Sequence, residues 1–138
     1  MDRIKEFFTE NDLFARHCGI ELIEVGKGTA RTRMKIQEHH LNGVRSVQGG
    51  AIFTLADLAF AAACNSHGTV AVAINVSITF IKAATGGTLT AEAKEVSVNP
   101  KLGTYSIQVT NDAGEVVATF QGLAYRKKES LESVMRKP

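Results

Sequence analysis

The run from Ala51 to Cys64 most constrains how this chain can fold, because nearly every side chain in it is apolar. Alanine and leucine, both good helix formers, are frequent in the run, so we expect a helix over about residues 50–66. A helix that is apolar on every face is buried on every face. The rest of the chain, or a second copy of it, must therefore enclose this helix.

Patterns on either side of this run predict the enclosing elements. Apolar residues at roughly helical spacing predict an N-terminal helix over about residues 2–17, interrupted near Asn11 and Asp12. Alternating or β-branched segments, separated by turns that mostly contain glycine, predict strands over about residues 20–25, 29–36, 70–82, 88–98, 104–110 and 115–126. The charged tail, about residues 127–138, is expected to fray or to form a short helix.

This order of elements predicts a single α+β domain over residues 1–138, in which an antiparallel β-sheet surrounds a long central α-helix. One sheet covers only one side of that helix. A second copy of the chain, related by twofold symmetry, is the simplest cover for the other side.

Composition narrows the class of protein. The formal net charge of +2, without a basic stripe, argues against nucleic acid as the main partner. Two cysteines make no disulfide framework, so we expect reduced thiols in a cytoplasmic protein. We expect no secretory signal, because the N-terminal residues lack an apolar stretch, and no membrane span, because the longest apolar run is shorter than the roughly 20 residues that one needs.

Asp57 is the lone carboxylate within the apolar run. An ionised carboxylate is costly to bury without partners, so Asp57 must lie at a cleft or be held by donors. Thr54, one helical turn earlier, shares its face and could donate a hydrogen bond. Desolvation would raise the pKa of Asp57 and make it a stronger base. The alternative is a structural aspartate that binds a neighbouring loop.

The segment before the helix offers further polar groups. Gly49 and Gly50 leave backbone N–H groups open at a helix N-terminus, where they could hold an oxyanion. A tight turn that needs positive φ is the alternative for this pair. Asn42 and Gln48 could orient a water or polarise a carbonyl group, although Asn42-Gly43 is also typical of a simple turn.

The remaining reactive side chains suggest no metal site. His39, His40 and His67 lack Cys, Asp or Glu partners at metal-ligand spacing, and we interpret them as surface loop histidines. Cys64 lies among alanines and has no basic neighbour, so we expect a buried thiol and not a nucleophile.

Several of these residues form a combined motif. It resembles the phenylacetic-acid-degradation (PaaI-like) acyl-CoA thioesterase family of hotdog-fold proteins. The resemblance is densest over about residues 41–68 and rests on Leu41-Asn42-Gly43, Ser46, Gly49-Gly50, Phe53, Leu55-Ala56-Asp57, Ala59-Phe60-Ala61 and Ala63-Cys64-Asn65-Ser66.

The resemblance implies a hotdog fold, in which the sheet wraps around the central helix. It implies homodimers that share one continuous sheet, homotetramers built from them, and active sites at the dimer interface. Asp57 would match the family's catalytic carboxylate and would face Asn42 and Gly49 of the other subunit. The activity implied is metal-free hydrolysis of an acyl-CoA thioester, often with an aromatic acyl group as in phenylacetate degradation. CoA enters as part of the substrate and no cofactor is needed.

One position departs from the family pattern. The family usually has histidine where this chain has Gln48, and glutamine can position a group but cannot take up a proton near neutral pH.

Asp57 would act as a general base or by direct attack. Candidate substrate contacts are Gly50, Phe53, Thr54, Asn75, Ser77 and Thr79, with Phe53 and Phe60 lining the acyl pocket. The alternatives are a non-hydrolytic acyl-CoA-binding or regulatory protein and an acyl-thioester hydratase or dehydratase.

Overall fold

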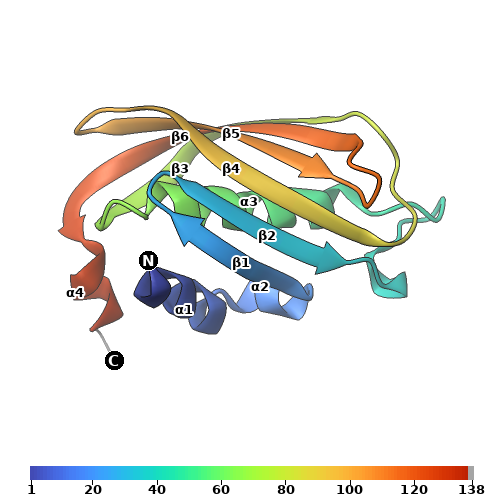
Figure 1. Ribbon diagram of the computed structural model, residues 1–138, viewed down its shortest axis with the longest axis horizontal. Coiled ribbons are helices and arrows are strands. Elements are labelled where there is room, and N and C mark those ends of the chain that lie inside the picture. Colours follow the sequence, from blue (N-terminus) through green and yellow to red (C-terminus); the bar gives the residue numbers. More distant parts are fainter. Residues whose placement is uncertain (137–138) are drawn as a thin grey trace.

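The computed structural model describes residues 1–136 and contains a six-stranded sheet with the strand order β1-β2-β4-β5-β6-β3. Every neighbouring pair is antiparallel. The strands are β1 (Ile20–Gly26), β2 (Thr29–Lys35), β3 (Thr69–Phe80), β4 (Thr88–Val98), β5 (Leu102–Thr110) and β6 (Val116–Ser130). The sheet curves over one long helix, α3 (Gly49–Cys64), which confirms the predicted α+β arrangement (Figure 1).

Short helices complete the chain: α1 (Asp2–Asn11), α2 (Leu13–His17), the 3-10 turn η1 (Glu38–His40) and α4 (Leu131–Met135). The N-terminal helical segment breaks at Asp12, whose side chain accepts a hydrogen bond from the Ala15 N–H at 3.1 Å and so caps α2. The two helices pack against β1 and the flank of α3 (Figure 1).

The C-terminal tail agrees with the sequence-based expectation in part, because the short helix α4 forms but the residues before it extend a strand. Residues 127–130 continue β6, where Ser130 pairs with Thr69 of β3, and α4 follows with Ser130 as its N-cap. Glu132 of α4 forms an ion pair with Arg3 at 2.9 Å, which brings the two ends of the described chain together. Residues 137–138 of the predicted tail lie outside the described residues.

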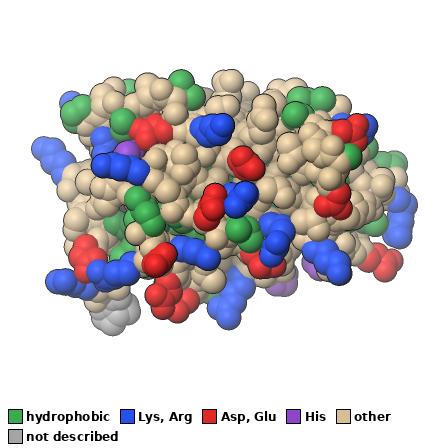
Figure 2. All heavy atoms as spheres, viewed as in Figure 1, with side chains coloured by type: hydrophobic (Ala, Val, Ile, Leu, Met, Phe, Trp, Pro, Cys, Tyr) green, Lys and Arg blue, Asp and Glu red, His purple; other side chains and the backbone are tan. Residues whose placement is uncertain are grey.

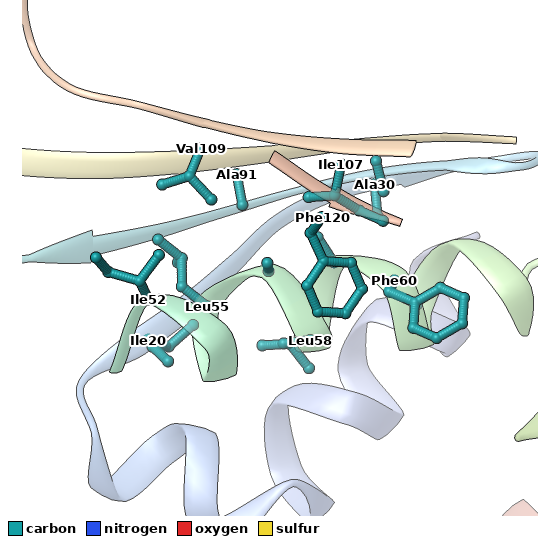
Figure 3. Close-up of a cluster of buried hydrophobic side chains, with 14 of the residues drawn as sticks. Ile20, Ala30, Ile52, Leu55, Leu58, Phe60, Ala91, Ile107, Val109 and Phe120 are labelled. Carbon is teal, nitrogen blue, oxygen red and sulfur yellow. The ribbon is translucent and has the colours of Figure 1, made fainter. Parts of the chain in front are cut away.

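The core lies between α3 and the sheet. Leu55, Ala56 and Ala59 of α3 are fully buried against it, and Figure 3 shows Phe60 and Phe120 in the layer between helix and strands. The Phe60 ring lies 5.6 Å from the Tyr105 ring and 5.8 Å from the Phe120 ring, between centroids. Gly122 lies directly beneath the Phe60 ring, where a Cβ atom would come within 2.6 Å of it. A side chain at this position of β6 would push helix and sheet apart.

Helix α3 is not buried on every face within one chain. Phe53, Thr54, Asp57 and Ala61 are only partly buried, and their spacing of three to four residues places them on a single stripe. The prediction of a fully enclosed helix is therefore met only in part by the described residues. We call this set of four residues the open stripe of α3.

Strand β3 forms one edge of the sheet. Apolar side chains on or next to it are exposed, among them Ile74 at 55%, Phe80 at 52% and Ile81 at 56%. An exposed apolar edge strand is a template for pairing with another chain. The surface elsewhere is mixed, and Figure 2 shows basic and acidic side chains interspersed on one face of the molecule. None of the described helices is long and apolar enough to cross a membrane.

Candidate active site

Asp57 lies on the open stripe of α3, and its carboxylate makes no hydrogen bond or ion pair within residues 1–136. Burial raises its pKa, and the negative charge of Asp12 on the neighbouring helix raises it further. A structural aspartate would be held by donors of a neighbouring loop, and the described chain supplies none. The carboxylate is therefore available to something outside this chain.

Thr54 does not donate to Asp57, which corrects the expected hydrogen bond. Its hydroxyl donates instead to the Gly50 carbonyl oxygen at 2.7 Å, one turn back along α3. Helical threonines commonly bond backward in this way. Thr54 and Asp57 still share the open stripe, but the hydroxyl leaves the carboxylate unsatisfied.

Gly49 and Gly50 begin α3, and their N–H groups have no acceptor in the described part of the chain. Neither residue has a positive φ, so the alternative of a strained turn is wrong for this pair. Gly49 also leaves room for a neighbour, because a Cβ there would lie 3.0 Å from the Phe80 ring and would displace it by a few tenths of an ångström. Two free donors at the positive end of a helix form a site for a developing negative charge.

Asn42 has the turn geometry that its sequence context favours. Its side-chain oxygen accepts from the N–H groups of Val44 at 3.0 Å and Ser46 at 3.2 Å. Its amide nitrogen donates to the Ser46 hydroxyl at 3.2 Å, which leaves one amide hydrogen free. The turn nevertheless places Asn42 beside Gly49, because both line one hollow of about 330 Å³ together with Phe80.

Gln48 is the N-cap residue of α3, but its side chain is exposed and makes no capping hydrogen bond. Its backbone is fixed, since its N–H donates to the His40 carbonyl at 2.8 Å. The side chain lies on a second hollow, together with Gly50 and Thr54. The helix start thus lies between two hollows, one with Asn42 and Gly49 and one with Gln48 and Gly50.

His40 is buried, with 4% of its surface exposed, so its interpretation as a surface histidine is wrong. Nδ1 accepts from the Gln37 N–H at 2.9 Å, and Nε2 therefore donates to the Cys18 carbonyl at 2.6 Å. This imidazole ties η1 to the end of α2. His67 is also largely buried, and its Nε2 lies 2.8 Å from Glu95 Oε2. His39 alone is exposed as expected.

Asp57 is not among the residues that line either hollow. It follows Gly49 by eight residues, a rise of about 12 Å along the helix axis. Reacting groups must approach to within about 3–3.5 Å. Asp57 and the Gly49 N–H of the same chain therefore cannot act on one small group, although a second copy could bring the two together.

The other predicted contacts are dispersed. The Phe53 ring lies 5.4 Å from the Phe120 ring, between centroids, at a tilt of 59°, and Phe53 is only partly buried. Phe60 is 1% exposed and cannot line an open pocket. Asn75, Ser77 and Thr79 occupy exposed positions of β3 that alternate with the partly buried Val76 and Ile78. They therefore lie on the face of the sheet turned away from α3, and the described chain does not bring them to Asp57 or Gly49.

Cys64 is buried as predicted, and burial together with the charge of Asp57 raises its pKa to about 12. Its thiol stays protonated at neutral pH and is not a nucleophile. Within residues 1–136, no group of three His, Cys, Asp or Glu side chains could hold a metal ion.

The sequence analysis did not identify two residues near the site, Asp12 and Phe14. The only sequence signal near them was the predicted break of the N-terminal helix at Asn11 and Asp12.

Comparison with known proteins identifies the family of this chain. A family described as the thioesterase superfamily matches residues 46–118. A putative esterase of Archaeoglobus fulgidus is 43% identical over 130 residues, which cover 94% of this chain and 84% of that protein. The acyl-coenzyme A thioesterase PaaI of Escherichia coli is 41% identical over 118 residues, or 85% of this chain and 84% of that protein.

Solved structures extend the similarity to the fold. The structure of the E. coli PaaI protein from the phenylacetic acid degradation operon superposes with a TM-score of 0.89. It is 37% identical in sequence, and the match covers 93% of this chain and 94% of that one. The expected hotdog fold and the resemblance to PaaI-like thioesterases are confirmed.

Proposed function

Because this chain belongs to the thioesterase superfamily and is a thioester hydrolase, we propose that it cleaves acyl-CoA into the free acid and CoA. The observation that carries the proposal is Asp57, a carboxylate of raised pKa without a partner in its own chain. The unpaired N–H groups of Gly49 and Gly50 supply the second element that such a reaction needs.

The carbonyl oxygen of the thioester would accept hydrogen bonds from the Gly49 N–H and from Gly50. These donors strengthen as negative charge develops on the oxygen, and loss of one such donor typically costs roughly 10²–10³ in rate. Gln48, exposed beside them, can donate to the substrate or accept from it but carries no proton through the reaction. The one free amide hydrogen of Asn42 is available to a water or to the substrate.

Asp57 would come from the second subunit. As a general base it takes a proton from water, and the hydroxide formed attacks the carbonyl carbon. The tetrahedral intermediate then collapses, the carbon–sulfur bond breaks, and the CoA thiolate takes up the proton. In the direct route the carboxylate itself attacks, CoA leaves, and water hydrolyses the mixed anhydride. Both routes yield the same acid and CoA.

The separation of Asp57 from Gly49 along α3 supports a site shared between two subunits, and the exposed edge of β3 suggests how the two subunits pair. We propose a homodimer in which two β3 strands extend one continuous sheet, with dimers pairing into a tetramer.

The free thiols of Cys18 and Cys64 fit the reducing cytoplasm. A phenylacetyl group is the candidate acyl group, by analogy with the E. coli relative and its operon.

The test is the variant Asp57→Asn, which keeps the shape of the side chain and removes its charge. We expect kcat/KM for thiol release from phenylacetyl-CoA to fall by roughly 10²–10⁴. The folded state raises the pKa of Asp57, so the ionised form costs stability at neutral pH, and the variant should unfold at the same or a higher temperature. Ala61→Ser, on the same stripe, is the control and should retain activity.

Full hydrolysis by folded Asp57→Asn would refute the catalytic assignment. Calorimetric binding of acyl-CoA by the wild-type protein without release of thiol would favour the non-hydrolytic alternative. Loss of an enoyl-CoA absorbance without release of thiol would favour a hydratase.

A further inference from the structure

A hollow of about 330 Å³ lies between α2 and the start of α3. Phe14 and Cys18 border it from the α2 side, and Gly50, Ala51 and Thr54 border it from α3. We call it the α2 hollow. Its α3 side consists of small residues on neighbouring turns, which is why space remains between the two helices.

The polar residues around the α2 hollow are largely satisfied elsewhere. The Thr54 hydroxyl donates to the Gly50 carbonyl, and both ring nitrogens of His40 are used by Gln37 and Cys18. These groups demand no polar ligand. The hollow therefore suits an apolar guest, with the exposed His17 and His39 at its rim.

Phe14 is held at this hollow by a rigid support. Helix α2 is capped by Asp12, anchored by Ala15 at 2% exposure, and tied to His40 through the Cys18 carbonyl. Phe14 is nevertheless 65% exposed. When a ligand covers a fixed and exposed aromatic ring beside an apolar hollow, a large apolar surface is removed from water, which stabilises the bound state. Leu13, its neighbour, is 68% exposed but does not line the hollow.

The α2 hollow adjoins the proposed reaction centre. Gln48 and Gly50 line it, and Gly50 is the neighbour of Gly49, whose N–H would bind the thioester carbonyl. A thioester bound at these N–H groups can direct its acyl group into the hollow. A cavity of roughly 150 Å³ already holds a benzene ring, so this volume admits a phenyl group or a medium-length alkyl chain.

We propose that the α2 hollow binds the acyl group of the substrate and that Phe14 sets the preference for large apolar acyl groups. This inference rests on the proposed function. It replaces the pocket that was expected at Phe53 and Phe60, where Phe60 is sealed in the core.

Two variants test it, Phe14→Ala and Ala51→Leu, with Leu13→Ala as the matched control on the same helix. Thiol release is measured with acetyl-CoA, hexanoyl-CoA and phenylacetyl-CoA, and kcat/KM is compared as a ratio to acetyl-CoA. We expect Phe14→Ala to lower the hexanoyl and phenylacetyl ratios by roughly 10-fold or more, because the loss of an apolar contact in a pocket changes the ratio of kcat/KM between two substrates by about that factor. Ala51→Leu should fill the hollow and lower the same ratios, while acetyl-CoA is spared.

Unchanged ratios in both variants, with hydrolysis intact, would overturn this inference and leave the proposed function standing. An equal change in Leu13→Ala would overturn it as well, since that side chain lies outside the hollow. If the wild-type protein released no thiol from any of the three esters, the proposed function would fail and this inference with it.

Discussion

At the scale of single residues, the proposed chemistry depends on two carboxylates on neighbouring helices, Asp57 and Asp12. The charge of Asp12 adds to desolvation in raising the pKa of Asp57. A raised pKa makes the ionised carboxylate a stronger base, but the carboxylate then ionises only at a higher pH. Asp12 is held in place as the N-cap of α2, so its charge is a fixed part of the site.

We predict that Asp12→Asn lowers the pKa of Asp57. Asparagine is as good an N-cap as aspartate, so α2 should persist while the repelling charge is lost. The rise of kcat/KM with pH, which reports ionisation of Asp57 in the free enzyme, should move to lower pH. Desolvation is the larger cause and remains, so the shift should be partial.

Glu10→Gln is the control for this pH profile. Glu10 and Asp12 border the same hollow beside α1, together with Lys5, Arg16 and Glu21, but Glu10 does not contribute to the raised pKa. A pH profile that moves equally in both variants, or in neither, would contradict a specific effect of Asp12.

Residue types alone indicated much of the candidate site. A lone charge in an apolar helix pointed to Asp57, and adjacent glycines pointed to open N–H groups. The burial of His40 was not predictable, because its partner is a carbonyl 22 residues away in the sequence. The close approach of the Phe80 ring to Gly49 was likewise not predictable, because Phe80 is distant in the chain.

At the scale of elements, the close approach of Phe60 of α3 to strand β6 depends on Gly122. Gly122→Ala would place a methyl group against the Phe60 ring. We predict a loss of about 1–3 kcal/mol in the free energy of unfolding, the usual cost of overpacking a core. Urea denaturation measures it, and Gly86→Ala is the control, because no atom lies within 4 Å of the position its Cβ would take. Equal free energies of unfolding for the two variants would contradict this prediction, because they would show that α3 and the sheet move apart without cost.

Periodicity predicted each strand and the central helix, because alternation and β-branching are local signals. It did not predict the extension of β6 through residues 127–130. That extension depends on pairing with Thr69 of β3, and a charged, polar segment carries no local sign of it. It also did not predict the bulges in β3, which arise where its register with β6 shifts.

At the scale of the whole molecule, the open edge of β3 should be the dimer interface. We predict that Ile74→Lys yields a monomer with little hydrolysis, because a charge on an edge strand opposes pairing. Light scattering after gel filtration measures the mass. Val96→Lys, which changes a residue that is 69% exposed on β4, should keep the dimer and its activity. A dimeric and active Ile74→Lys variant would exclude this edge.

The central claim is that hydrolysis needs Asp57 of one subunit and the Gly49 N–H of the other. Gly49→Pro removes that N–H at the first helical position, where proline is best tolerated, and its Cβ requires the half-exposed Phe80 ring to move by a few tenths of an ångström. Homodimers of Gly49→Pro and of Asp57→Asn should each be nearly inactive. A mixed dimer has one site with both lesions and one intact site.

The decisive measurement is thiol release from phenylacetyl-CoA after the two variants are unfolded together, in equal amounts, and refolded. Random pairing of subunits should restore about a quarter of the wild-type rate, because half of the dimers are mixed and each has one working site. Mixed dimers that form without any recovery of activity would place both residues in a single-chain site and contradict the account.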